Sequence, residues 1–159
     1  MIRINREATD GRYKISDIFP DIGHNPILRE LFKTPSELKD VLIGTAVILT
    51  DRPSYMKVDN ADGSILINLR HLLHSDAVIL YLDIIHELVH VKQHRQGLDL
   101  YDRSKAYVDR ETEIDAYAFT IKEARRLGLT DKQILDYLRV EWITPEEHLR
   151  LAKRLNLDV

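Results

Sequence analysis

Two histidines four positions apart, His86 and His90, lie in a largely apolar stretch of the chain that runs from Ala77 to Val91. Such a stretch favours a buried helix, and residues i and i+4 of a helix project from the same face. Both imidazole rings can then reach one metal ion, at about 2.0–2.1 Å if the ion is zinc. Burying two histidines without such a partner would be costly, because polar groups lose their hydration in the interior. The pair therefore predicts a fold built around a central helix that carries part of a metal site.

Glu87 follows the first of these histidines in the string His86-Glu87-Leu88-Val89-His90. This HExxH spacing is typical of zinc hydrolases, in which the glutamate faces the open side of the ion without binding it. A metal ion lowers the pKa of a bound water from about 15.7 to about 7, and a carboxylate beside it can accept the proton. We therefore predict that Glu87 is the general base of a hydrolase.

A catalytic zinc ion has three protein ligands and one open position, so a third ligand is expected downstream. Residues 110–119 read as a second helix, on which Glu111 and Asp115 share a face. We predict that Glu111 is the third zinc ligand and that Asp115 accepts the second N–H of a ligating imidazole, which fixes its tautomer. Two alternatives stay open: Glu113 as the ligand instead, or a helix face that is charged and simply solvated.

The two predicted helices together resemble those of the gluzincin metallopeptidases, which pair HExxH with a downstream ExxxD. Here His86-Glu87-x-x-His90 precedes Glu111-x-x-x-Asp115, and the 21 positions from His90 to Glu111 are near the separation in thermolysin-like enzymes. The longer string Glu111-x-Glu113-x-Asp115-x-Tyr117-Ala118 is also similar to the patterns of the HtpX and CAAX prenyl protease class and of the ImmA/IrrE-type peptidases. The combination is fairly specific for the superfamily and does not select a branch.

This resemblance covers about residues 55–120 and is closest to the minigluzincins, which are single-domain soluble forms of the same core. Thr112 and Ile114 depart from the longer pattern, which has an aromatic residue and an alanine at these places. The resemblance implies a zincin-like α+β fold, with a small mixed sheet packed on the active-site helix and the glutamate helix. It also implies that the strand ending at Leu69 forms the upper rim of a cleft, where an extended peptide pairs with it.

The organisation of the chain agrees with one domain over residues 1–159, with a core at about 45–128 and a helical C-terminal segment at 129–159. β-branched residues predict a strand at 45–50. Two further apolar segments, 55–59 and 64–69, flank Asn60-Ala61-Asp62-Gly63, which predicts a hairpin.

Local signals mark several element ends. Gly97 is expected to end the active-site helix. Thr130 with Gln133, and Thr144 with Glu147, form two capping boxes that predict short C-terminal helices. Residues 1–30 read as irregular, because turn residues interrupt them repeatedly. A short helix is expected to begin near Pro35.

Composition narrows the class of protein further. The chain has 159 residues and no cysteine, so disulfides and thiolate metal sites are excluded. A formal net charge of −3 provides no basic field for binding nucleic acid. The chain shows no secretory h-region and no apolar run near the ~20 residues of a membrane span, so a cytoplasmic protein without direct nucleic-acid or membrane partners is expected.

Hydrolysis through a tetrahedral intermediate also needs a donor to the developing oxyanion. Four downstream side chains are candidates for this donor, each with ordinary packing as the alternative: Tyr107, Arg110, Tyr117 and His148. Three further histidines are expected at the surface rather than at the metal: His24, His71 and His74.

The sequence therefore predicts a zinc-dependent endopeptidase, whose partner is a peptide or protein substrate. His86, His90 and Glu111 would hold Zn²⁺, Glu87 would activate water, and Asp115 would support a ligand histidine. The resemblance to minigluzincins implies that a terminal segment can make the enzyme latent. Two alternatives remain: a regulatory peptidase or repressor-binding protein of the ImmA/IrrE kind, and a non-catalytic zinc protein.

Overall fold

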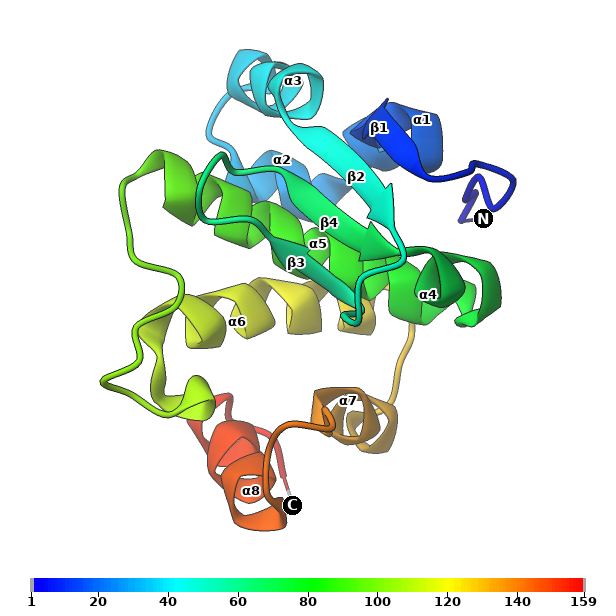
Figure 1. Ribbon diagram of the computed structural model, residues 1–159. Helices are drawn as coiled ribbons and strands as arrows, with labels where there is room; N and C mark the ends of the chain where they lie inside the picture. Colours follow the sequence, from blue (N-terminus) through cyan, green and yellow to red (C-terminus); the bar gives the residue numbers. More distant parts are fainter. Residues whose placement is uncertain (1, 159) are drawn as a thin grey trace.

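A four-stranded sheet lies against one side of the long helix α5 (Ala77–Arg95), as Figure 1 shows for the computed structural model, which describes residues 2–158. The strands are β1 (Gly11–Lys14), β2 (Ala46–Thr50), β3 (Met56–Val58) and β4 (Ile65–Asn68). The other helices are α1 (Ile15–Ile18), α2 (Pro26–Leu31), α3 (Pro35–Gly44), α4 (Leu69–His74), α6 (Glu111–Arg126), α7 (Asp131–Leu138) and α8 (Pro145–Arg154), with single 3₁₀ turns η1 (Ile22–His24) and η2 (Tyr107–Asp109). The α+β class predicted from the sequence is confirmed.

The sheet has the order β1-β2-β4-β3, and β2 and β4 run parallel while the two outer pairs are antiparallel. The predicted strand at 45–50 and the predicted hairpin are confirmed as β2 and as β3 with β4. The expectation that the strand ending at Leu69 forms the cleft rim is wrong, because β4 is paired with β2 on one side and with β3 on the other. Its buried run Ile65-Leu66-Ile67 suits a central strand. The edge beside α5 is β3 instead.

Helix α5 is the element on which both halves of the fold pack. Asp76 caps its first turn by accepting a hydrogen bond from the Val78 amide, at 2.9 Å. The helix ends before Gly97, whose φ of +79° is one that glycine adopts at little cost, so the predicted end is confirmed. One apolar cluster fills the space between α5, the sheet and α1–α3, and a second lies between α5, α6, α7 and α8. The position of α5 between the two clusters makes it a rigid base for the residues in its middle.

Regular elements begin earlier than the sequence suggested. Residues 2–10 contain no helix or strand, as predicted, but β1, α1, η1 and α2 follow from Gly11 onward, so the prediction of an irregular segment is wrong for residues 11–30. These elements are short, and burial holds them: Ile15, Ile18 and Phe19 are fully buried. Asn25 caps α2 and also donates to the buried Glu123 of α6 and to the Tyr81 hydroxyl, which anchors this segment on the main helices.

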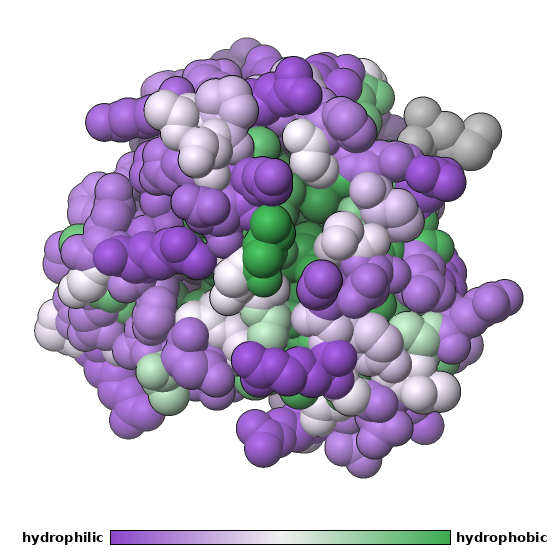
Figure 2. Space-filling model, turned by 90° about the horizontal axis from the view of Figure 1, so that it is seen from above, coloured by the Kyte–Doolittle hydropathy of each residue, from purple (hydrophilic) through white to green (hydrophobic). Residues whose placement is uncertain are grey.

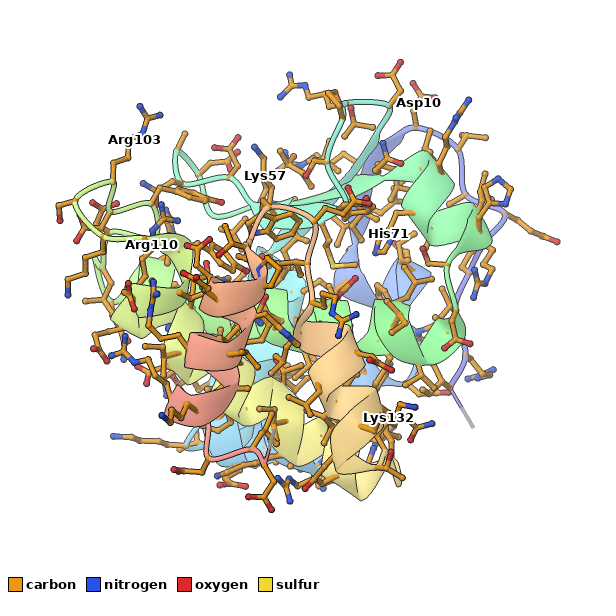
Figure 3. All side chains as sticks on the ribbon, turned by 90° about the horizontal axis from the view of Figure 1, so that it is seen from below. Asp10, Lys57, His71, Arg103, Arg110 and Lys132 are labelled. Atoms are coloured by element: carbon orange, nitrogen blue, oxygen red, sulfur yellow. The ribbon has the colours of Figure 1, made fainter. Side chains whose placement is uncertain are left out.

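The C-terminal part consists of α6, α7 and α8, which lie below α5 in Figure 1. Both predicted capping boxes are confirmed, since Thr130 and Gln133, and likewise Thr144 and Glu147, bond reciprocally. The connection between α7 and α8, residues 139–144, returns toward the sheet side of the molecule (Figure 3). It places these residues close to the middle of α5.

Within residues 2–158, no helix combines the length and the apolar character needed to cross a membrane. The face seen from above in Figure 2 is mainly hydrophilic, with apolar side chains gathered in a narrow strip near its centre.

Candidate metal centre

Three buried side chains from two neighbouring helices converge on one point. His86 and His90 come from α5 and Glu113 from α6, and their residues are 5%, 5% and 4% exposed. Glu113 Oε1 lies 3.0 Å from His86 Nε2 and 3.1 Å from His90 Nε2, and the two Nε2 atoms are 3.2 Å apart. The predicted pair of histidines on one helix face is therefore present, together with a carboxylate.

The outer nitrogens of both histidines are occupied, which orients the rings. Gln93 donates through Nε2 to the Thr112 carbonyl at 3.0 Å, so its Oε1 faces His90 and accepts from Nδ1 at 2.7 Å. Thr120 donates to the Ala116 carbonyl, and its oxygen can accept from His86 Nδ1 at 3.4 Å. In neutral imidazoles the hydrogen then sits on Nδ1 and a lone pair on Nε2.

Two nitrogen lone pairs and a carboxylate oxygen therefore point at each other. These groups repel unless a cation lies among them, and the cation is either a proton or a metal ion. In the metal-free protein this cation is a proton on His90. Burial alone would lower the pKa of His90, but the Glu113 carboxylate outweighs burial and raises that pKa to about 9. Burial likewise opposes ionisation of Glu113, but the two imidazoles hold its pKa well below the usual range. The donor set therefore suits a divalent cation.

The carboxylate at this point is Glu113, and the assignment of Glu111 is corrected. The Glu111 side chain is 68% exposed and faces Arg154, with an N–O distance of 3.5 Å. Glu113 lies on the opposite side of α6 and shares its buried face with Ala116 and Tyr117. Of the two alternatives left open by the sequence, the structure favours Glu113.

Asp115 is corrected as well, because it is exposed on α6 and makes no contact with either imidazole. The partners of the ring N–H groups are Gln93 and Thr120. A signal for Glu113 was present in the sequence: the apolar positions Ala116, Tyr117 and Ala124 define the face of the helix that meets α5.

Glu87 lies beside the donor cluster and is 7% exposed. Burial raises the pKa of its carboxyl to about 8 in the metal-free protein. A cation held by the neighbouring donors would oppose that shift, because an opposite charge favours the ionised form. Its position between two small cavities lets it reach a water or a bound molecule in either one.

The smaller cavity, of about 60 Å³, lies over the donor cluster, and its walls include Met56, Leu100 and Tyr101. The Tyr101 hydroxyl donates to the carbonyl of Val58 on β3. This bond connects the loop after α5 to the edge strand and closes one end of the site.

The larger cavity, of about 260 Å³, opens beside His86 and Glu87, between Tyr55 near β3 and the connection that joins α7 to α8. Tyr117 of α6 forms part of its wall, with its ring centroid 4.3 Å from that of His86. The Tyr117 hydroxyl bonds that of Tyr107 at 2.7 Å. Tyr117 is therefore the candidate oxyanion donor that faces the site.

Tyr107 is linked to the site through its bond to Tyr117, and the remaining two candidate donors have other partners. Arg110 donates to the Asp102 carbonyl at 3.0 Å, and its side chain lies on the side of the molecule that also carries Arg103 (Figure 3). His148 bonds the Leu135 carbonyl at 2.7 Å. Neither faces the donor cluster, so the structure does not support a role for them at the site.

The expectation that His71 lies at the surface is wrong. The His71 side chain is only 8% exposed, and its Nε2 lies 2.7 Å from Asp83 while Nδ1 lies 2.7 Å from the Ser75 hydroxyl. His24 and His74 are exposed as predicted. Asp83 also accepts from Tyr137 at 2.6 Å, so His71 belongs to a polar network beside the larger cavity.

Across residues 2–158, the donor cluster contains His86, His90 and Glu113 and no fourth histidine, cysteine or carboxylate. In that part of the chain, no residue from 2–30 or 140–158 therefore joins the cluster as a ligand. Comparison of the chain with family models, curated proteins and solved structures gave no match in any of the three.

Proposed function

We propose that this protein is a zinc-dependent peptidase in which His86, His90 and Glu113 hold the ion and Glu87 is the general base. The observation that carries the proposal is the convergence of three buried donors with their electron pairs directed inward, next to a second buried carboxylate, that of Glu87, which is not one of the three. Metal-assisted hydrolysis uses such an arrangement, in which two histidines and one glutamate hold the ion and a further carboxylate lies beside it.

The donor geometry supports zinc as the ion. Three ligands at about 2.0–2.1 Å from a tetrahedral ion are about 3.3–3.4 Å from one another. The separations of 3.0–3.2 Å between the His86, His90 and Glu113 atoms are close to this value. The nitrogen and oxygen donors also suit zinc, and with three protein ligands one position stays open for a substrate or water. When bound, the ion would act as a Lewis acid that polarises a carbonyl group and lowers the pKa of water.

The protein's own residues then perform the proton transfers. Glu87 would accept a proton from the attacking water and later give one to the leaving amine. Tyr117, whose ring packs beside His86, would donate a hydrogen bond to the oxyanion. Gln93 and Thr120 hold the imidazoles with their Nε2 atoms toward the ion.

The edge strand β3 supports a peptide as the substrate. Tyr55 and Asp59 direct their backbone groups to β4, through bonds with Asn68 and Ser64. Because the direction alternates along an antiparallel pair, Met56 and Val58 direct theirs to the open edge. An extended peptide can add to such an edge by main-chain hydrogen bonds. The Val58 carbonyl is already occupied by Tyr101, so Met56 provides the free groups.

The proposal is tested with the zinc-loaded full chain and a casein-type substrate. We expect one zinc per chain and measurable hydrolysis, and the Glu87→Gln variant should keep its zinc while hydrolysis falls by roughly 10²–10⁴-fold. Glu111→Gln is the matched control and should stay active. Full activity of metal-loaded Glu87→Gln would refute the assigned role, and stoichiometric zinc without any hydrolysis would instead indicate a structural metal site.

A further inference from the structure

The larger cavity beside the candidate metal centre is lined both by apolar side chains and by several carboxylates. Trp142, Tyr55 and Ile79 provide apolar walls. Asp83, Asp136 and Glu141 bring three carboxylates to the same cavity. These groups come from separate elements: α5, α7, the stretch before β3, and the connection between α7 and α8. The fold thus assembles both a hydrophobic surface and negative charge at one place.

The charge of this cavity is only partly balanced by the protein. Arg139 is the one lysine or arginine in the lining, and within residues 2–158 it forms no ion pair with Asp136 or Glu141. Asp83 is held by His71 and Tyr137, while the Glu141 carboxylate contacts the Tyr55 hydroxyl. Asp136 and Glu141 are both exposed at the mouth of the cavity, where a ligand of opposite charge can contact them.

The aromatic walls favour the same kind of ligand. Trp142 is 53% exposed, and its ring centroid lies 6.3 Å from that of Tyr55, with the two planes tilted by 31°. Aromatic faces attract ammonium and guanidinium groups through their quadrupoles. In Figure 3 the connection between α7 and α8 reaches toward β3, which carries the labelled Lys57. Tyr55 and Trp142 line one hollow together with Lys57, so a peptide paired with β3 would pass the two rings.

We infer that this cavity binds a lysine or arginine side chain of the peptide substrate, next to the bond that is cleaved. This inference rests on the proposed peptidase function. The aromatic pair would contact the aliphatic stem, and Asp136 and Glu141 would face the cationic head. The volume of about 260 Å³ is ample for such a side chain, given about 30 Å³ for each water in the liquid.

Other side chains fit the lining less well. A purely apolar side chain would displace water from the carboxylates of Asp83, Asp136 and Glu141 without replacing its hydrogen bonds. An acidic side chain would be repelled by the same three groups. Arg139 lies at the rim and is too solvated to reverse the sign of the charge around it.

Trp142 is the only tryptophan of the chain, so its fluorescence reports on this cavity directly. The test uses the zinc-loaded Glu87→Gln protein, titrated with N-acetyl-lysine amide and with the neutral N-acetyl-norleucine amide. We expect the lysine probe to change the Trp142 emission with saturation and the norleucine probe to bind more weakly. The double variant Asp136→Asn/Glu141→Gln should bind the lysine probe roughly 2- to 30-fold more weakly. Glu146→Gln, an exposed change on α8 outside the cavity, is the matched control.

Equal binding of both probes, or no effect of the double variant, would overturn the inference. A second experiment, cleavage of a mixed peptide library by the zinc-loaded wild type, distinguishes failure of the inference about the cavity from failure of the proposed peptidase function. Enrichment of lysine or arginine at one position beside the cleaved bond supports the inference, and cleavage without that enrichment contradicts it. Absence of all cleavage contradicts the peptidase function, and the fluorescence titration then decides on the cavity alone.

Discussion

Glu113 and Glu111 are two positions apart on α6, but Glu113 is buried at the candidate metal centre and Glu111 is exposed to solvent. Mutating each of them therefore tests which glutamate belongs to the metal site. We expect Glu113→Gln to weaken zinc binding and Glu111→Gln to leave it unchanged. The first change removes the anionic donor that lies 3.0 and 3.1 Å from the two imidazoles. The second removes a weak surface pair with Arg154, and such pairs contribute about 0–1 kcal/mol.

The expected size follows from the site. Loss of a residue that merely supports a ligand weakens metal binding by about 10–100-fold, so loss of a ligand should cost at least the upper end of that range. At a zinc concentration of 1,000 times the wild-type Kd, zinc stabilises the wild type by about 4.1 kcal/mol. A 100-fold weaker variant keeps about 1.4 kcal/mol, a difference of about 2.7 kcal/mol. For a chain of 159 residues this difference corresponds to a fall in Tm of roughly 5–11 °C.

The assay is thermal unfolding of each protein with chelator and with buffered zinc, together with metal content after gel filtration. Comparing each variant with its own metal-free form removes any direct effect of the substitution on folding. Wild-type zinc affinity in Glu113→Gln, or a loss of zinc in Glu111→Gln, would refute the three-donor site and restore the arrangement predicted from the sequence.

Three further outcomes follow from the structure. Gln93→Leu removes the acceptor that holds His90 and should weaken zinc binding by about 10–100-fold, measured by competition with a chromogenic chelator. In the metal-free protein the pKa of Glu87 is raised to about 8 and that of His90 to about 9, so both bind more protons folded than unfolded between pH 6.5 and 8. The free energy of unfolding from urea titrations should therefore fall as the pH rises through this window, by up to ~1.4 kcal/mol per pH unit for each group, and Glu87→Gln should flatten the slope. Asn25→Ala removes the cap of α2 and a hydrogen-bond partner of buried Glu123, so it should lower the free energy of unfolding by about 2–4 kcal/mol. An unchanged midpoint in a urea titration would contradict this expectation.

The parts of the fold that could be predicted are those whose cause is local. The hairpin depends on the turn residues 60–63, and the last two helices depend on capping boxes that begin at Thr130 and Thr144. The long helix α5 is apolar over many turns, and Gly97 marks its end. Each of these signals lies within a few residues of the element that it specifies.

The N-terminal elements lacked such signals. Helix α1 has four residues and α2 has six, which is too short for a hydrophobic period to be visible. Their order depends on distant contacts, above all the bond from Asn25 to Glu123, 98 positions away. The pairing of β2 with β4, which made β3 the edge strand, is likewise a contact between segments that are separated along the chain. Neither could be read from neighbouring residues.

The third donor of the candidate metal centre, Glu113, was missed for a different reason: the relevant information was local, but the prediction gave it too little weight. A step of two residues turns a helix by about 200°, so Glu111 and Glu113 cannot both face α5. Matching the spacing of a known motif favoured Glu111, whereas the apolar stripe through Ala116, Tyr117 and Ala124 favoured Glu113. Burial decides between them, since a helix turns its apolar stripe toward its neighbour and its charged residues toward water. Any ligand assigned on a helix by motif spacing should therefore be checked against the apolar face of that same helix before its number is accepted.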